Sequence, residues 1–470
     1  MSVRRFPRIT IPGMLSALSL IVSAACSPAA VDYAELRSAA QARLPARSLA
    51  PESNDVKALL RAPITPDSAA RIAVLNNRGL RASLEDLSIA NAELSRARRL
   101  PNPTLEGALR YHRHGGTDLE VGALIDLSSF LLLSVRSRAA EAQVAATRLA
   151  SIGAILDLTF DAKRAYYEYQ AALDALELRK TVSRALAASA EAAQRLHDAG
   201  NITDLELASE SSLYEEARLT EQRASAHLAA AREHLNTVLG VFGNADRWST
   251  SGRMAKPPAE ELAVNALESS AVKRSLELRI SEQRYAAAAQ RENFARARGL
   301  LPELKAGVSA EREESWGVGP AVEIEVPLLY QGQADVAVAR AQKRKQIETY
   351  ADLAVRVRSN ARATATRLGA ARDAVLYYES TLLPLKAKIV EETQLKYNAM
   401  LIGVFQLLQA KRDQVETAAR YVEQLKEYWL LRTDAEQLLS GRLTPGNSAF
   451  ASPSNTSEMP STAGAMRDAH

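Results

Sequence analysis

The few residues of this 470-residue chain that could do chemistry stand at spacings that favour structural roles. His112 and His114 are two residues apart in an alternating stretch, so both side chains point to one face of a strand. This spacing suits a metal ion, but two histidines from one strand supply too few ligands for a metal site. We interpret them as solvated residues and expect no metal site.

Two further patterns suit a ligand no better. Glu206 and Glu210 lie one helical turn apart, where two carboxylates could hold a cation, but such charges are typical of a solvated helix face. Gly317-Val318-Gly319 lacks the third glycine of a dinucleotide-binding loop. No Ser, Cys or His is placed as a nucleophile with its base. The sequence therefore predicts a protein that is not an enzyme and holds no cofactor.

The first residues of the chain indicate export. Three arginines precede an apolar run over residues 11–22, and small residues then lead to Cys26, which is the order of a secretory signal. The run is shorter than the roughly 20 apolar residues of a membrane span. We expect residues 1–25 to be a signal peptide. No later run approaches 18 uncharged apolar residues, so we expect no membrane-spanning helix in the mature chain.

Cys26 is the only cysteine, so the chain forms no internal disulfide. Its position directly after small residues resembles the lipobox of bacterial lipoproteins, in which the thiol carries a lipid anchor. Ser23 departs from that motif, which usually has leucine there. The resemblance implies lipid attachment at Cys26, and Ser27 in place of the aspartate that retains lipoproteins in the inner membrane implies the outer membrane. The alternative is ordinary signal-peptidase cleavage, which leaves an unmodified thiol.

The mature chain is close to neutral. The whole sequence has 59 basic and 55 acidic residues, and removal of residues 1–25 takes away three arginines and no acid, which leaves 56 against 55. A nucleic-acid-binding protein is expected to carry a net basic patch, so the balance argues against a nucleic-acid partner. The abundance of Ala, Leu, Glu, Arg and Gln is typical of long helices.

The second half of the sequence repeats the first at a shift of about 200 residues. Leu100-Pro101 corresponds to Leu301-Pro302, and Ala199 to Ala399. Each half predicts a helix, a strand hairpin, a very long helix, a tight turn and a long helix. The predicted divisions are two repeats over residues 66–250 and 251–442, an extended lead-in over 26–65 and a disordered tail over 443–470.

Alternating residues predict four strands, in hairpins over 104–127 and 304–328. In each strand one face is mainly apolar and the other carries charges, which is typical of a membrane barrel. Backbone groups in lipid must all be paired, so only a closed barrel spans a membrane, and closure takes about eight strands or more. Since four strands cannot close, we predict a twelve-stranded barrel shared by three copies. A soluble four-stranded sheet with one solvated face is the alternative.

Each hairpin is followed by long helical segments. No proline occurs between residues 133 and 196, and apolar residues recur there at coiled-coil spacing. About sixty helical residues would extend roughly 90 Å, a length suited to crossing a periplasm. Partner helices are predicted over 203–239 and 403–439, and Pro384 predicts a kink or a joint in the fourth segment.

Over residues 66–442 the sequence resembles the TolC-like outer-membrane efflux proteins, the outer membrane factor family. The resemblance rests on the doubled architecture, on Leu100-Pro101-Asn102-Pro103 and Leu301-Pro302 before the strands, and on the hairpin tips at 199–204 and 397–403. It implies a mainly α fold with β strands, in which a homotrimer forms a twelve-stranded β-barrel in the outer membrane and a long α-helical coiled-coil tunnel in the periplasm.

The resemblance also implies a function. Members of the family are passive, gated exit ducts, and they meet a periplasmic adaptor (membrane fusion) protein and an inner-membrane pump, here of the resistance-nodulation-division type. It places the gate and the adaptor-docking sites at the two tips. The residues at these positions are Gly200, Thr203 and Asp204 in the first tip, and Leu401, Ile402, Gly403, Phe405, Gln406 and Gln409 in the second.

Some members of the family carry acidic residues just after the second tip, where this sequence has Gln406 and Gln409. We therefore expect closure to depend on apolar packing and dewetting. The alternative is that these side chains pack between neighbouring helices without gating.

Two questions stay open at the level of sequence. A periplasmic lipid-anchored coiled-coil structural or adaptor protein without a pore is the alternative function, although it would have no lipid-facing strands. Residues 403–411 look most like the heavy-metal branch of the family, which serves cobalt-zinc-cadmium or copper-silver pumps. The few Met and His residues offer no metal relay, so metal ions, drugs and other solutes all stay open as cargo.

Overall fold

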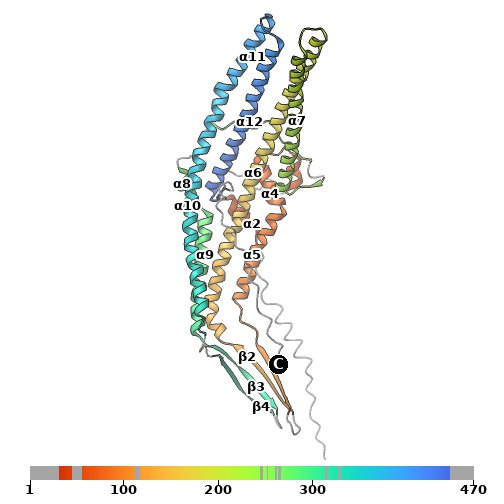
Figure 1. Cartoon of the computed structure of the whole chain (residues 1–470). Helices are drawn as coiled ribbons and strands as arrows, with labels where there is room; N and C mark the ends of the chain where they lie inside the picture. The colour runs from red at the N-terminus through yellow and green to blue at the C-terminus, as the bar shows by residue number, and fades with distance from the viewer. Residues whose placement is uncertain are drawn as a thin grey trace, which may run out of the picture.

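The protein is elongated, with a small sheet at one end and the turns of two helical hairpins at the other (Figure 1). The computed structural model describes residues 31–44, 55–111, 117–243, 247–250, 252–259, 262, 266–312, 316–325 and 330–444. The predictions made for residues 1–25, Cys26, His112, His114 and 445–470 lie outside the described residues.

The order of elements predicted for each half is confirmed. The first half contains α2 (Tyr33–Gln41), α3 (Val56–Arg61), α4 (Pro66–Asn76), α5 (Arg78–Ala97), β1 (Thr104–Tyr111), β2 (Thr117–Asp126), α6 (Ser128–Asp198) and α7 (Asp204–Leu239). The second half contains α8 (Leu267–Arg274), α9 (Leu276–Leu300), β3 (Glu303–Arg312), β4 (Trp316–Glu325), α10 (Gln333–Tyr377), the π-helix η3 (Tyr378–Leu382), α11 (Leu383–Asn398) and α12 (Val404–Ser440).

The expectation of an extended lead-in over residues 26–65 is wrong, because α2 and α3 are helices. Asp32 and Asp55 cap their first turns by accepting hydrogen bonds from backbone N–H groups. Leu36 and Ala40, one turn apart on α2, are buried in a cluster that includes residues of α6. A short amphipathic stretch with an aspartate cap is enough for a helix once a larger helix covers its apolar side.

The four strands form one antiparallel sheet in the order β1-β2-β3-β4. The central pair, β2 and β3, joins the two halves of the chain, with Gly122 opposite Ser309. Gly307 allows this close approach, since a Cβ atom there would collide with the carbonyl oxygen of Ala123. Among the described residues, β1 and β4 pair on one side only, so the sheet has two open edges.

The hydrophobic core follows α6, which is 71 residues long and contributes to all three buried clusters. Leu156 packs with α5 and α9, Tyr166 packs with α4 and α7, and Ala171 packs with α10 and α12. Tyr167 of α6 stacks on Trp429 of α12 with ring centroids 4.9 Å apart. One helix of the first half therefore forms the common wall for both halves.

A partly buried charged cluster ties the end of α12 to α6 and α9. Arg442 donates from Nε to Asp157 Oδ1 at 2.9 Å, and its Nη1 lies 3.0 Å from Glu277 Oε1. Gly153 on α6 leaves room for the guanidinium, because a Cβ there would lie 2.9 Å from Arg442 Nη1. The cluster joins three segments that are far apart in the sequence.

The joint predicted near Pro384 is confirmed. The π-helix η3 ends two residues before this proline and separates α10 from α11. Proline cannot donate the usual helical hydrogen bond, and a wider turn is a common accommodation. Glu379 in η3 accepts a hydrogen bond of 2.5 Å from Tyr421 Oη of α12 and lies 3.3 Å from Lys256 Nζ.

Replacement of Arg442 by methionine should lower the free energy of unfolding by about 2 kcal/mol, because it leaves two neighbouring, partly buried carboxylates without their cation. Arg358→Met, an exposed change on α10, is the matched control. Denaturant unfolding of both variants in detergent measures the difference. Equal midpoints for the two variants would contradict the role assigned to the cluster.

Candidate functional site

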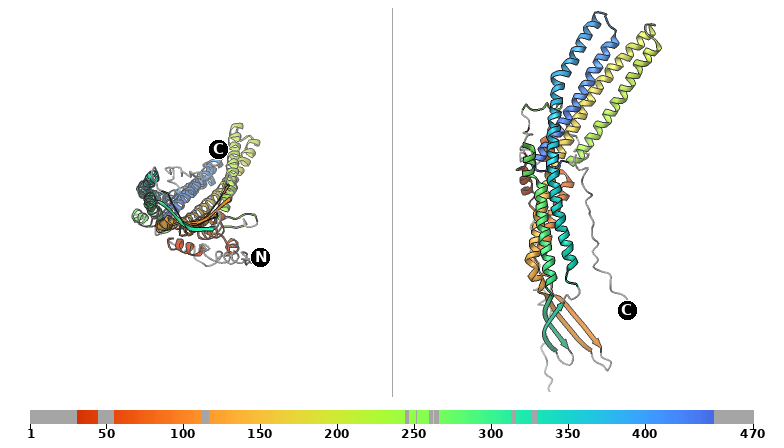
Figure 2. Two further views of the ribbon diagram at one scale, coloured as in Figure 1. Left: turned by 90° about the horizontal axis from the view of Figure 1, so that it is seen from below. Right: turned by 60° about the vertical axis from the view of Figure 1, so that its left-hand side comes forward.

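The candidate site consists of the two tips that were predicted to form the gate and docking surface. The first tip joins α6 to α7, and the second joins α11 to α12. Figures 1 and 2 show the two hairpins side by side and separated from each other toward their tips. Among the described residues, no hydrogen bond or ion pair joins one tip to the other. The ion pair closest to the tips that links the hairpins is Arg179–Glu416, at 2.7 Å.

The two tips share one backbone conformation. Gly200 and Met400 occupy the same position in the repeat, and both adopt the left-handed conformation, with φ values of 74° and 56°. Gly200 N donates to the carbonyl oxygen of His197 at 2.8 Å, and Met400 N donates to that of Tyr397 at 2.9 Å. This pattern of turn hydrogen bonds is one that commonly ends a helix.

The residues that start the return helices differ between the tips. Thr203 forms a capping box with Glu206, whose carboxylate accepts a hydrogen bond of 2.8 Å from Thr203 N. That hydrogen bond lowers the pKa of Glu206. Gly403 stands at the matching position of the second tip and gives α12 no side-chain cap. The first tip is therefore the better stabilised of the two turns.

The second tip places a large apolar side chain where the backbone favours glycine. Met400 is the one non-glycine residue with positive φ in the described part of the chain, and it is 93% exposed. Leu401 beside it is 73% exposed, whereas the first tip has Asn201 at this position. A left-handed L-residue costs about 1–2 kcal/mol. Such strain together with exposed apolar groups is typical of a contact surface.

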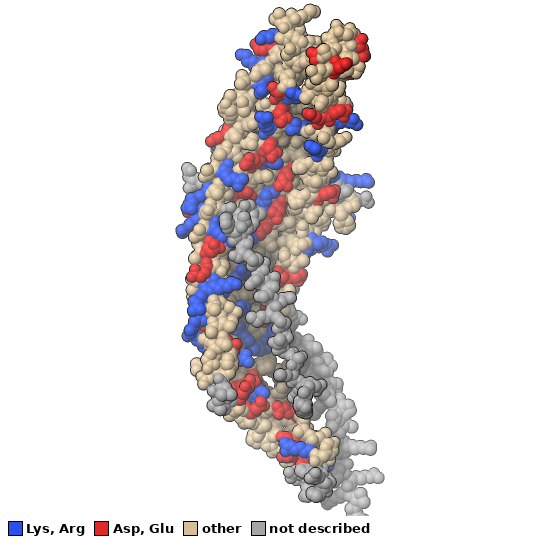
Figure 3. Space-filling model, viewed as in Figure 1, with Lys and Arg blue, Asp and Glu red and all other residues tan. Residues whose placement is uncertain are grey.

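The tips also carry opposite charge. Residues 193–212 contain four carboxylates and one arginine, a net charge of −3, while residues 393–412 contain three basic residues and no acid, a net charge of +3. Figure 3 shows acidic groups gathered on the first tip and mostly uncharged atoms at the end of the second. Comparing equal windows of the two repeats would have found this difference from the sequence.

The remaining predicted tip residues make local contacts. Asp204 lies 2.7 Å from Nε2 of His197. The side chain of Gln406 folds back over Gly403, since a Cβ there would lie 3.0 Å from its Oε1. Gln409 donates to Asp413 at 2.9 Å. Ile402 and Phe405 are partly buried.

The patterns first weighed for ligand chemistry have structural partners. Glu206 caps α7, and Glu210 accepts a hydrogen bond of 2.7 Å from Ser189 of α6, so the two carboxylates are not paired on one cation. Gly317 and Gly319 lie within β4, which is not a phosphate-binding loop. Within the described ranges, no group of three or more His, Cys, Asp or Glu residues is placed to hold a metal ion.

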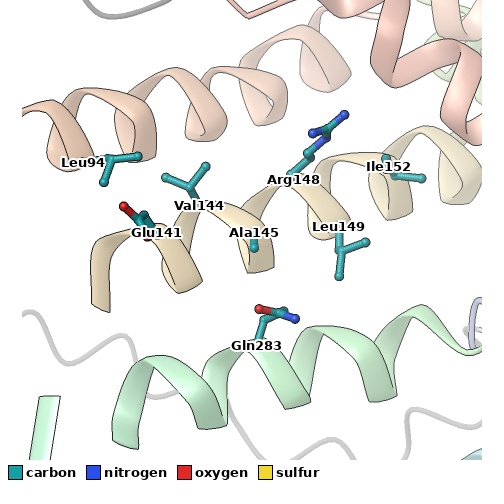
Figure 4. Close-up of a pocket in the computed structure, with 8 residues that line it drawn as sticks. All are labelled: Leu94, Glu141, Val144, Ala145, Arg148, Leu149, Ile152 and Gln283. Atoms are coloured by element: carbon teal, nitrogen blue, oxygen red, sulfur yellow. The ribbon is translucent and has the colours of Figure 1, made fainter. Parts of the chain in front are cut away.

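A shallow cavity of about 480 Å³ lies between α5, α6 and α9 (Figure 4). Its wall is apolar apart from three residues, Glu141, Arg148 and Gln283. The two charged residues already have partners, because Glu141 pairs with Arg98 and Arg148 pairs with Glu35. The cavity wall therefore offers no nucleophile with a base.

No helix in the described part of the chain is both long enough and apolar enough to cross a membrane.

Met400→Gly should stabilise the second tip by about 0.5–1 kcal/mol, because relief of left-handed strain outweighs the added freedom of glycine in the unfolded chain. Gly200→Met in the first tip is the mirror variant and should destabilise it. Hydrogen exchange of the tip amides measures both effects. Slower exchange in both variants, or in neither, would contradict the assigned backbone strain.

No family model matches the sequence. The cobalt-zinc-cadmium resistance protein CzcC of Cupriavidus metallidurans is 21% identical over 382 residues, which cover 80% of this chain and 90% of CzcC. The CmeC outer membrane channel of Campylobacter jejuni aligns with a TM-score of 0.67 at 13% identity, over 82% of this chain and 88% of CmeC. The outer membrane protein VceC of Vibrio cholerae aligns with a TM-score of 0.66 at 13% identity, over 80% of this chain and 96% of VceC. The resemblance to the TolC-like outer-membrane proteins is therefore confirmed, and the chain has their fold.

Proposed function

We propose that the chain is one protomer of an outer-membrane exit duct of a tripartite efflux system. In this proposal three copies form a passive, gated path from an inner-membrane pump and a periplasmic adaptor to the exterior. The duct does no chemistry of its own, and no cofactor is part of the proposal. The observation that carries it is the open four-stranded sheet, whose edges and apolar side chains are both uncovered in the single chain.

The side chains of the sheet support a membrane location. Leu105 and Val318, one on each edge strand, are 83% and 72% exposed. Such residues on an open sheet would promote aggregation in water, and in lipid they are favourable. Their backbone groups at the edges need partners in lipid. Three copies would supply twelve strands, which is the number that the resemblance stated above implies.

The helices support a periplasmic tunnel. At 1.5 Å per residue the 71 residues of α6 extend about 105 Å from the sheet toward the first tip. The helices α10 and α11, joined through η3, run parallel to this path in the second half (Figure 1). We propose that three copies arrange these helices as a coiled-coil tunnel. Lipid attachment at Cys26 would anchor the lead-in at the same membrane.

The tips support docking and gating at the periplasmic end. An adaptor that contacts both tips meets an acidic surface at the first and an apolar, basic-flanked surface at the second. We propose that apolar packing of Leu401, Ile402 and Phe405 from the three copies narrows the path, because a constriction lined by such side chains excludes water. Gln406 and Gln409 are uncharged, so closure does not require protonation of a carboxylate at these two positions.

The cargo is proposed to follow the pump of the system. The name of CzcC favours cobalt, zinc and cadmium ions, with drugs and other solutes as alternatives. A pump of the resistance-nodulation-division type is the partner that the family resemblance suggests. The competing function, a lipid-anchored coiled-coil structural protein without a pore, gives no role to the exposed apolar strands.

The first test is the native mass of the mature chain extracted from outer membranes. We expect a detergent-dependent trimer of about 150 kDa, three times the mature chain, which is slightly lighter than the 50.9 kDa of the whole sequence. Migration in gels that changes on heating should accompany it, because a closed sheet resists unfolding in detergent. A soluble monomer would contradict the duct proposal and favour the structural protein without a pore.

The second test addresses the gate. Leu401→Ser and Phe405→Ser channels in planar bilayers should open more often and conduct more, since polar side chains wet the constriction. Leu205→Ser is the matched control, because Leu205 takes the position of Phe405 in the first tip. Conductance equal to that of the wild type in the two gate variants would rule out an apolar gate.

A further inference from the structure

Basic residues gather where the helices meet the sheet. Four segments of 14 residues adjoin the strands, and they cover residues 86–99, 128–141, 287–300 and 333–346. All of these residues are helical except Arg98 and Arg99, which follow the end of α5. Together they contain twelve Lys or Arg and five Asp or Glu, a net charge of +7. The chain beyond residue 25 has a net charge of only +1, so its remaining residues are net acidic. We call the Lys and Arg residues of these four segments the cationic belt.

The belt is accessible on the molecule. Figure 3 shows Lys and Arg concentrated along the edge formed by α9 and α10, in the half of the molecule that ends in the sheet. Arg298, Arg344 and Lys345 are all exposed. In the first half, Arg98 extends from the end of α5 and keeps 58% of its side chain exposed although it pairs with Glu141.

A single buried carboxylate organises part of the belt. Glu292 on α9 is 3% exposed, and it lies 2.5 Å from Lys343 Nζ and 3.5 Å from Arg340 Nε of α10. Arg296 pairs with the same carboxylate. Hydrogen bonds from Lys343 and Arg296 lower the pKa of Glu292 to about 2, so it stays ionised at neutral pH. One negative charge thus holds three cations in place and leaves a positive surplus.

Exposed apolar side chains separate the belt from the strands. Phe130 and Leu131 at the start of α6 are 61% and 64% exposed, and Leu300 at the end of α9 is 83% exposed. Leu100 and Tyr330 lie at the corresponding junctions and are also exposed. From the sheet outward, the order is therefore apolar strands, apolar junction residues and cations. This order is typical of a membrane interface, where long basic side chains reach headgroups from just outside the apolar layer.

We propose that the cationic belt binds the anionic headgroups of phospholipids in the periplasmic leaflet of the membrane that the strands enter. This inference rests on the proposed function, because it requires the sheet to lie in that membrane. The phosphodiester of a lipid such as phosphatidylglycerol carries one negative charge, and arginine matches its oxygens with two parallel N–H donors. A trimer would present 21 net positive charges around the duct, three times the +7 of one chain.

Carboxylates at the strand ends do not cancel the belt. Asp126, Glu303 and Glu325 lie at this junction and reduce the net charge to +4 per chain when they are included. Asp126 accepts hydrogen bonds from the hydroxyl groups of Ser128 and Ser129 at the start of α6. The remaining surplus favours anionic over zwitterionic lipid at each chain.

The test measures lipid retained by the full-length trimer in a non-ionic detergent. Native mass spectrometry counts bound phosphatidylglycerol and phosphatidylcholine after addition of an equal mixture. The belt variant combines Arg298→Gln, Arg344→Gln and Lys345→Gln. The control variant combines Arg358→Gln, Lys388→Gln and Lys396→Gln, three exposed cations far from the sheet. We expect the wild type and the control to prefer phosphatidylglycerol, and the belt variant to lose about fivefold or more of that preference.

The outcomes separate the sources of an anion and the two proposals. An unchanged preference in the belt variant would overturn the lipid inference while the trimer stands. Binding of the two lipids without preference, suppressed equally by inorganic phosphate, would show that the belt binds small anions only. This outcome would also overturn the lipid inference. A third outcome would also overturn the lipid inference. If the belt variant kept its lipid preference but no longer bound isolated peptidoglycan, the belt would be assigned to the cell wall. A wild-type chain that is a soluble monomer would overturn the duct and the belt together.

Discussion

A four-stranded antiparallel sheet with apolar side chains and two open edges is the constraint on which the rest of this structure depends. The edge strands β1 and β4 present unpaired backbone groups, which in lipid must find partners. Because β2 and β3 already pair across the two halves, a single chain can add strands only at its edges. Assembly of several copies around an axis is the proposed way to pair both edges.

The long helices turn this local constraint into an extended molecule. Helix α6 packs against elements of both halves, and two of the three buried clusters contain residues from both of them. Arg442 holds α6, α9 and the end of α12 together near the middle of the molecule. Toward the tips the hairpins are then joined by the ion pair Arg164–Asp434 and by the stacking of Tyr167 on Trp429. Among the described residues, Arg179–Glu416 is the ion pair between the hairpins that lies farthest toward the tips. Hairpins that are joined in the middle and separate at their tips suit the proposed duct, which would open at its periplasmic end.

The two tips show how one backbone can serve two surfaces. The turn hydrogen bonds depend only on the length of the turn and on a left-handed residue, so they are the same in both halves. Side chains that point into solvent are not limited by this geometry. The first tip uses its side chains to cap α7 and carries negative charge, whereas the second forgoes the cap, accepts a strained Met400 and exposes apolar groups. A partner that binds both tips therefore needs one surface that suits an acidic tip and another that suits an apolar tip.

The sequence by itself determined the elements whose signals are local. Alternation with period two located the strands, coiled-coil spacing located α6, and the shift of 200 residues paired Ala199 with Ala399 and so located both turns. The strained position of Met400 could also have been inferred, because Gly200 occupies the matching site. Only the tertiary structure decided the strand order, the helices of the lead-in, the partners of Glu206 and Glu210, and the meeting of Arg442 with Asp157. These features depend on contacts between residues far apart in the chain or on the covering of a weakly amphipathic segment, and no local period encodes either of them.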